Sequence, residues 1–258
     1  MAPNVRLPVG VVASHKKGER TIDINADFSL PVLLHSHDLA WQDSPLPGVQ
    51  RRMLDRLGDE VARATSIVRY APNSEFSPHV HTGGEEFLVL EGVFQDEHGD
   101  YPAGSYVRNP PQSRHTPRSQ PGCVIFVKLW QFDLADRTHV RMDIEKVGQV
   151  KDSANPGVAI TPLFKDTRET VRIEHWSAGA RVSIDACQGA ELFLLSGGAD
   201  HAGTALREGS WLRLPVRPSI EGAGDGRVSA NTELIAGPEG AKVWIKTGHL
   251  RYVERPQD

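Results

Sequence analysis

The sequence predicts an all-β protein, because short runs of β-branched and aromatic residues alternate with turn-forming residues along most of the chain. The 258 residues include 24 glycines and 18 prolines, which recur between these runs. Short strands with regularly spaced turn signals are typical of β-sandwiches and β-barrels. The runs are residues 64–70, 86–91, 105–108, 124–130, 170–176, 192–195, 210–214 and 242–247. Helical patterning is confined to residues 49–57 and 58–64, which we expect to form short helices.

An internal repeat divides the chain into two copies of one module. Residues 86–92 (EFLVLEG) correspond to residues 191–197 (ELFLLSG), and residues 104–110 (GSYVRNP) correspond to residues 209–215 (GSWLRLP). We therefore expect two tandem barrels, residues 1–148 and residues 149–258. Turn-forming residues predict a linker near residues 147–156.

Composition excludes several classes of protein. The chain is 39% hydrophobic with a formal charge of -4, and no run of lysine or arginine favours nucleic-acid or membrane-surface binding. Cys123 and Cys187 are far apart and form no C-x-x-C pair, so we expect neither a disulfide framework nor a zinc finger. The first ten residues lack the apolar stretch of a signal peptide, and no segment could span a bilayer, so we expect a cytoplasmic protein.

The candidate site is a metal-binding pattern in the first module. His79 and His81 are two residues apart, so on a strand they share one face. Glu85 follows after a Gly-Gly turn, and His115 can arrive from a neighbouring strand. Three imidazoles and a carboxylate suit Fe(II), Mn(II), Ni(II), Cu(II) or Zn(II), so the donor set does not name the metal. We expect one divalent ion per chain, bound by His79, His81, Glu85 and His115.

The second module provides an internal comparison. Aligning its glycines with those of the first copy places Ile184 opposite His79, Ala186 opposite His81 and Ala190 opposite Glu85. The same alignment places Ile220 opposite His115. Since all four candidate ligands are missing, we expect a metal-free, degenerate second barrel.

Another H-x-H pair occurs at His35 and His37, but Trp41 occupies the position that Glu85 holds in the first pattern. We interpret this pair as part of a loop or an edge strand.

The spacing His79-x-His81-x3-Glu85-x6-Gly92 resembles the first motif of the cupin superfamily. Residues 104–115 resemble the second motif, with Gln112 where glycine is usual. Residues 84–92, 96–104 and 106–111 are similar to the cupin domain of the ChrR anti-sigma factor family, and this resemblance covers roughly residues 39–132. It implies two double-stranded β-helix (jelly-roll) barrels, with a metal bound by the four residues above in the first. Glycine at this position of the motif allows a positive φ, so the departure at Gln112 bears only on the conformation of the loop.

The resemblance leaves two functions open. ChrR-like proteins clasp a sigma factor through an N-terminal helical zinc-binding domain, and the residues before Trp41 lack the Cys/His cluster that it needs. Other cupins similar to this branch are non-haem iron dioxygenases that cleave diketone-like or hydroxyketone substrates. We therefore expect a metal-dependent enzyme of dioxygenase type, with Fe or Zn favoured over Mn and Ni. The alternative is a non-catalytic zinc- or ligand-binding sensor related to ChrR.

The remaining expectations concern partners and surrounding residues. We expect a small-molecule substrate or ligand, no nucleic acid, no membrane and a homodimer, and we assign no catalytic residue and no organic cofactor. Strand parity places Ser77, Phe87 and Val89 on the inward face with the ligands. Five further residues could either line the mouth or pack elsewhere: Tyr70, Tyr106, Arg108, Lys128 and Trp130.

Overall fold

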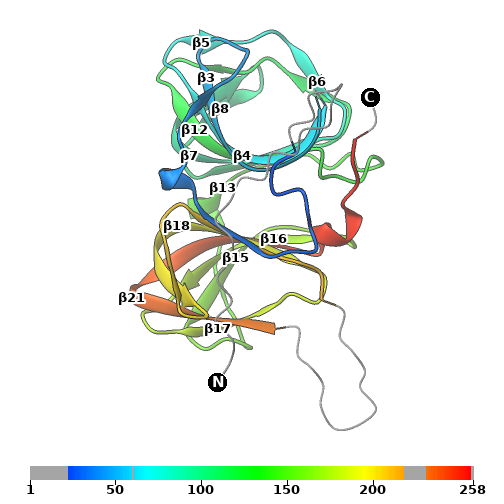
Figure 1. The fold of residues 1–258 in the computed structure, drawn as a ribbon. Helices are drawn as coiled ribbons and strands as arrows, with labels where there is room; N and C mark the ends of the chain where they lie inside the picture. Colours follow the sequence, from blue (N-terminus) through cyan, green and yellow to red (C-terminus); the bar gives the residue numbers. More distant parts are fainter. Residues whose placement is uncertain (1–22, 60, 218–230, 257–258) are drawn as a thin grey trace. The chain divides into compact units, whose positions relative to one another are not determined.

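The computed structural model describes residues 23–59, 61–217 and 231–256. Within these residues the protein consists of β-strands, and the only helices are 3-10 turns of three or four residues (Figure 1). None of these turns could cross a membrane. The predicted all-β, jelly-roll fold class is confirmed.

The chain folds into two compact units, each with its own sheets. Of the described residues, the N-terminal unit contains 23–26, 38–59, 61–148 and 254–256, and the C-terminal unit contains 27–37, 149–217 and 231–253. The expected domain boundary at residue 148 stays a prediction. The contacts within the structure also assign residues 27–37 to the C-terminal unit, although they precede the first module in the sequence.

The N-terminal unit has a main sheet in the order β13-β9-β7-β12-β4-β3-β2, and β6 and β10 form a separate pair. In Figure 1 its strands, coloured cyan to green, curve round a common axis. Its elements are β2 (Gln42–Asp43), β3 (Val49–Gly58), β4 (Ala62–Tyr70), β5 (Ser74–Glu75), β6 (His79–His81), β7 (Glu85–Asp96), β8 (Gly99–Pro102), β9 (Ser105–Asn109), β10 (Ser113–His115), β11 (Arg118–Ser119), β12 (Cys123–Leu129), β13 (Val140–Asp143) and η2 (Ile144–Lys146).

The C-terminal unit has a sheet in the order β1-β20-β18-β21-β16-β15-β14. Each position of this order has its counterpart in the N-terminal unit, so the sequence repeat is also a repeat of topology. The elements are β1 (Val32–His35), η1 (Ser36–Asp38), β14 (Val150–Lys151), β15 (Val158–Lys165), β16 (Thr170–Trp176), β17 (Arg181–Asp185), β18 (Ala190–His201), β19 (Thr204–Arg207), β20 (Ser210–Leu214), β21 (Asn231–Thr247) and η3 (His249–Tyr252).

The edge strands β1 and β13 occupy equivalent places in the two sheets. β1 pairs antiparallel with β20. β13 likewise pairs antiparallel with β9, which is the counterpart of β20. A 3-10 turn follows each of them, and its first amide donates to a glycine carbonyl: Ser36 to Gly209 at 2.9 Å, Ile144 to Gly104 at 3.0 Å. β1 precedes all strands of the first copy in the sequence, yet it completes the sheet of the second.

The helices expected at residues 49–57 and 58–64 are absent, and this prediction was wrong. Residues 49–58 form β3, which pairs with β4 along its whole length. Gly58 ends β3 with a φ of +119°, and β4 begins at Ala62. Pairing with β4 and burial against the core outweigh the weak helical propensity of this segment.

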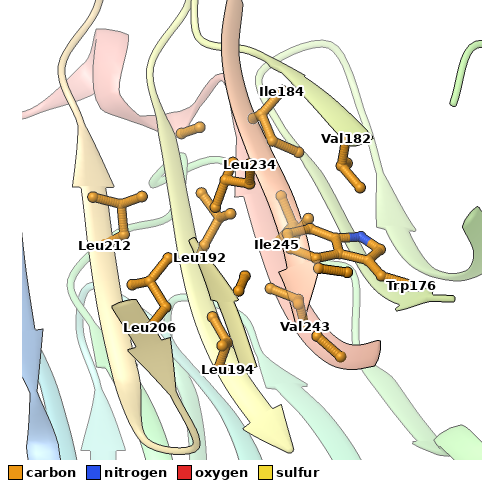
Figure 2. Packing of buried hydrophobic residues seen from close by; sticks show 14 of the residues in the cluster. Trp176, Val182, Ile184, Leu192, Leu194, Leu206, Leu212, Leu234, Val243 and Ile245 are labelled. Carbon is orange, nitrogen blue, oxygen red and sulfur yellow. The ribbon is translucent and has the colours of Figure 1, made fainter. Parts of the chain in front are cut away.

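The interior of the C-terminal unit is filled by aliphatic side chains together with the indole of Trp176 (Figure 2). Ile184, Ala186 and Ala190, which the alignment matched to three of the candidate ligands, are each at most 1% exposed within this cluster. Ile220, matched to the fourth, lies outside the described residues. Burial of this apolar surface stabilises the unit, and these three positions carry no ligand atoms.

Candidate metal centre

Two paired strands bring the three histidines together. β6 and β10 are antiparallel, and the Cα atoms of His79 and His115 are register partners. His81 lies two residues further along β6, on the same face as His79. Glu85 is the first residue of β7, after the turn that ends β6. His81, Glu85 and His115 are buried, whereas His79 is exposed.

The donor atoms of these side chains converge. Nε2 of His81 lies 2.9 Å from Nε2 of His115, and Oε2 of Glu85 lies 3.4 and 3.6 Å from these two nitrogens. One donor atom from each of the three histidines can be chosen so that all lie within 4.8 Å of one another. Metal–nitrogen bonds of about 2.1 Å place neighbouring ligand atoms about 3 Å apart at right angles. The residues therefore fit a divalent ion, and among the described residues no second group of this kind converges.

Three hydrogen bonds orient the donor groups. Nδ1 of His79 lies 3.2 Å from the carbonyl oxygen of Ser77, and Nδ1 of His115 lies 3.2 Å from Oδ2 of Asp96. Because both oxygens accept, each Nδ1 carries the proton and each Nε2 keeps its lone pair for the centre. Nδ2 of Asn109 donates to Oε2 of Glu85 at 3.1 Å.

Asp96 belongs to a buried chain of polar groups behind His115. The hydroxyl of Tyr101 donates to Oδ1 of Asp96 at 3.2 Å, and the amide of His98 donates to the same oxygen at 2.8 Å. Nε of Arg141 donates to the Tyr101 hydroxyl at 3.0 Å. Asp96 was not among the candidate site residues predicted from the sequence, because it becomes a partner of His115 only through the folding of the chain.

The charges of the four side chains depend on one another. Burial alone would raise the pKa of Glu85, but His81, His115 and the Asn109 amide lower it overall, so Glu85 is ionised. Burial lowers the pKa of His81. Burial would also lower the pKa of His115, but the bond to Asp96 and the charge of Glu85 raise it overall. A buried carboxylate among three imidazoles favours a bound cation.

The turn before Glu85 requires glycine at both positions. A Cβ on Gly83 would lie 2.1 Å from the ring of Trp130, and a Cβ on Gly84, which has a φ of +81°, would lie 2.5 Å from Phe132. The Trp130 amide donates to the Gly84 carbonyl at 3.1 Å. These contacts pack the turn closely and so determine where β7 begins.

Gln112 adopts the backbone conformation that glycine would take. Its φ is +70°, and its amide donates to the carbonyl of His81 at 2.9 Å. The expected positive φ is confirmed, and the departure from the cupin motif leaves the loop geometry intact.

Inward and outward side chains follow strand parity. Phe87 and Val89 are buried in the core cluster of the N-terminal unit, and the ring of Phe94 lies 5.7 Å from that of His115. The residues that could have lined the mouth of the barrel have different environments. Trp130 packs on the turn at Gly83. Three others contact partners on the opposite face of the sheet. These are Tyr106 with Glu86, Arg108 with Glu86 and Asp136, and Lys128 with Thr65.

The other H-x-H pair lies in the C-terminal unit. His35 is on the edge strand β1, and its Nδ1 lies 2.8 Å from Oγ of Ser210. His37 lies in the 3-10 turn η1 that follows, so the pair spans an edge strand and a turn, in agreement with its interpretation as part of a loop or an edge strand.

Comparison with known proteins agrees with this geometry. Residues 30–133 match the model of the ChrR cupin-like domain. No curated protein matches the sequence. Similar solved structures include a candidate dioxygenase of Nostoc punctiforme, with 15% identity over 89% of this chain and 88% of that chain, and a TM-score of 0.68.

Two further structures share the fold. The nickel(II) complex of the pirin YhhW from Escherichia coli is 12% identical over 84% of this chain and 98% of that chain, with a TM-score of 0.58. A deletion mutant of oxalate decarboxylase from Bacillus subtilis is 10% identical over 84% of this chain and 76% of that chain, with a TM-score of 0.57. Residues 30–133 therefore match a ChrR cupin-like domain, and the chain shares its fold with these solved structures.

Proposed function

We propose that this protein is a metal-dependent enzyme of dioxygenase type that acts on a small diketone- or hydroxyketone-like substrate. The observation that carries the proposal is the convergence of His81, His115 and Glu85 within 3.6 Å, with His79 at the exposed side. A centre whose donors are buried on one side and exposed on the other leaves room for a substrate.

In this proposal His79, His81, His115 and Glu85 hold one divalent ion per chain, with Fe or Zn favoured. When bound, Fe(II) would supply Lewis acidity and redox chemistry toward dioxygen. The side chains prepare the site: Ser77 and Asp96 hold the imidazoles in one tautomer, and ionised Glu85 offsets part of the positive charge. Phe87, Val89 and Phe94 exclude water from the inner side.

The solved relatives are consistent with metal chemistry on this fold. One carries the name of a candidate dioxygenase, one is a nickel(II) complex, and one is an oxalate decarboxylase. At 10–15% identity they share the fold, so the activity is proposed from the donor set of this chain.

A second candidate function is a non-catalytic zinc or ligand sensor. The match of residues 30–133 to the ChrR cupin-like domain favours it. In that case four protein ligands would close a tetrahedral zinc site, and no substrate would be turned over.

Metal analysis of the purified protein, combined with an oxygen electrode, tests both candidates. The enzyme requires bound iron and oxygen uptake with at least one member of a diketone and hydroxyketone panel. Bound zinc without oxygen uptake, also after reconstitution with Fe(II), would support the sensor instead. His81→Ala and His115→Ala should abolish metal binding, while the matched control His35→Ala should retain it. If the control loses metal and the others keep it, the centre is misassigned.

A further inference from the structure

Tyr101 lies behind the candidate metal centre, separated from the ligand His115 by a single side chain. Its hydroxyl donates to Oδ1 of Asp96 at 3.2 Å, and Oδ2 of the same carboxylate lies 3.2 Å from Nδ1 of His115. The ring centres of Tyr101 and His115 lie 6.2 and 5.7 Å from that of Phe94. Hydrogen bonds and ring packing thus both connect Tyr101 to the ligand.

Arg141 fixes the direction in which the Tyr101 hydroxyl donates. Nε of Arg141 donates to the hydroxyl oxygen at 3.0 Å. Because a guanidinium has no acceptor, the tyrosine oxygen accepts this bond and directs its own hydrogen at Asp96. Arg141 is exposed, whereas Tyr101, Asp96 and His115 are buried. The hydrogen bonds therefore run in one direction, from the surface to the buried carboxylate.

The Asp96 carboxylate accepts hydrogen bonds on both of its oxygens. Oδ1 accepts from the Tyr101 hydroxyl and from the amide of His98, and Oδ2 accepts from Nδ1 of His115. These bonds together hold the carboxylate in one orientation. Without the Tyr101 hydroxyl, Oδ1 would lose one of its two donors in a place that is closed to water, and the hold on Oδ2 would loosen.

The second copy has no counterpart of this hydroxyl. The glycine alignment places Leu206 opposite Tyr101. The pairing in the two hairpins agrees with it, since Tyr101 pairs with Phe94 and Leu206 pairs with Ala199 at the matched place. Leu206 belongs to the core cluster of the C-terminal unit. An aliphatic side chain therefore fills this position in the copy whose described matched positions carry no ligands.

The other two members of the chain are replaced as well. The glycine alignment places His201 opposite Asp96. Leu33 of β1 stands opposite Arg141 of β13, because the two strands pair in the same register with β20 and β9. Burying polar groups costs free energy that apolar side chains do not cost. The chain of polar groups therefore accompanies the metal ligands and is not a requirement of the fold.

We infer that Tyr101 is a positioning residue of the metal centre, which, oriented by Arg141, holds Asp96 so that His115 presents Nε2 to the ion. This inference rests on the metal-binding part of the proposed function and applies equally to an enzyme and to a sensor. It gives Tyr101 and Arg141 a role that is separate from that of the four ligands.

The test uses cobalt(II) as the probe, because its affinity and its visible absorption spectrum both report on the ligands. Tyr101→Phe in the full chain should weaken Co(II) binding about fivefold, the effect of one hydrogen bond of ordinary strength, and should shift the absorption bands.

The matched control is Tyr106→Phe. It also removes a hydrogen bond from a buried tyrosine to a carboxylate, that of Glu86, but on the opposite face of the sheet. Both variants should lower the stability of the metal-free protein in urea denaturation to a similar extent. Only Tyr101→Phe should change the affinity for Co(II) and the spectrum.

Further variants test the order of the chain. Arg141→Leu should weaken Co(II) binding about as much as Tyr101→Phe, whereas Arg141→Lys, which keeps a donor, should retain most of the affinity. In an Asp96→Ala background Tyr101→Phe should have no further effect on Co(II) affinity, because Tyr101 acts through Asp96.

Three results would overturn the inference. The first is an unchanged Co(II) affinity and spectrum in Tyr101→Phe. The second is equal weakening in Tyr101→Phe and Tyr106→Phe, since a general loss of stability would then explain both. The third is an undiminished effect of Tyr101→Phe in the Asp96→Ala background. If Asp96→Ala does not fold, the comparison of the two tyrosine variants decides.

Failure of the proposed function gives a different pattern. A wild type that binds neither Co(II) nor Fe(II) nor Zn(II) would overturn the metal centre and, with it, the role of Tyr101. Metal binding that is equal in wild type and Tyr101→Phe would overturn the role of Tyr101 alone. Neither decision depends on oxygen uptake, which separates the enzyme from the sensor.

Discussion

Asp96 determines which nitrogen His115 presents to the centre. Asp96→Asn removes the charge that holds the proton on Nδ1, and we expect it to weaken metal affinity by about tenfold to a hundredfold. His115→Ala should weaken it much more. Competition with a coloured chelator measures the affinity. Asp100→Asn serves as the control, because Asp100 lies on the same hairpin but its carboxylate accepts a hydrogen bond from Gln95. Equal affinities in Asp96→Asn and wild type would show that His115 is oriented by other contacts.

The thiol of Cys187 provides a test that depends on pH. Its pKa is raised chiefly because the thiol donates a hydrogen bond to the Asp185 carboxylate. A raised pKa means less thiolate at pH 8, so Asp185→Asn should accelerate alkylation of Cys187 by iodoacetamide at this pH. At pH values well above the pKa both proteins hold thiolate, and the two rates should converge.

Cys123 is the internal reference for this measurement. Burial raises its pKa to about 11, and its side chain lies in the core cluster of the N-terminal unit. It should therefore react slowly in both proteins, as peptide mass spectrometry can show. Faster alkylation of Cys187 in wild type than in Asp185→Asn would contradict the assigned cause.

Residues of the site differ in how far the sequence alone could predict them. His79, His81, Glu85 and His115 follow from spacing, because parity and a glycine turn are local properties. Asp96 acts through register, which places a hairpin aspartate behind His115. Nothing in the residues next to Asp96 in the sequence signals this partner.

At the scale of elements, the long central strands β7 and β18 bend at equivalent glycines. Gly92 and Gly197 have φ values of +69° and +73°, and a Cβ on either would meet a glycine carbonyl oxygen at 2.0 or 2.2 Å. In both copies a neighbouring backbone passes directly over the bend, so a residue with a Cβ does not fit there without a shift.

Alanine at this bend should therefore cost more than backbone strain alone. Gly179→Ala isolates that strain, because its φ is also +69° but no atom lies within 4 Å of the added Cβ. We expect a loss of about 1 kcal/mol for Gly179→Ala and about 3 kcal/mol for Gly197→Ala. Urea denaturation measures both, and equal losses would mean that the carbonyl moves aside freely.

β3 shows why element type was harder to predict than element order. Residues 49–58 contain three arginines and little alternation of polar and apolar residues, because Arg51 faces inward among apolar neighbours. An arginine on an inner face breaks the alternation from which a strand is normally inferred.

At the scale of the whole molecule, two units of one topology differ in what fills them. The N-terminal unit has four ionisable donor side chains at its candidate metal centre. At the three matched positions that the structure describes, the C-terminal unit has aliphatic side chains. Metal binding should therefore stabilise only the N-terminal unit, by about 2.7 kcal/mol when the free ion is at 100 times its dissociation constant.

Hydrogen exchange can locate this effect. Added metal should slow exchange in peptides that cover β6, the start of β7 and β10, and leave those that cover β18 and β20 unchanged. In His81→Ala the metal should have no effect on either set. Protection confined to the C-terminal unit would mean that the ion binds there.

The position of β1 has a consequence for synthesis on the ribosome. Its partner strand contains Ser210, which is 175 positions after His35. At about 5–20 residues per second, β1 leaves the ribosome roughly 10 to 35 s before β20 is made. During that time its backbone groups are open to other strands, including those of a second nascent chain. β1 can therefore pair with its partner only after β20, close to the C-terminus, has been synthesised.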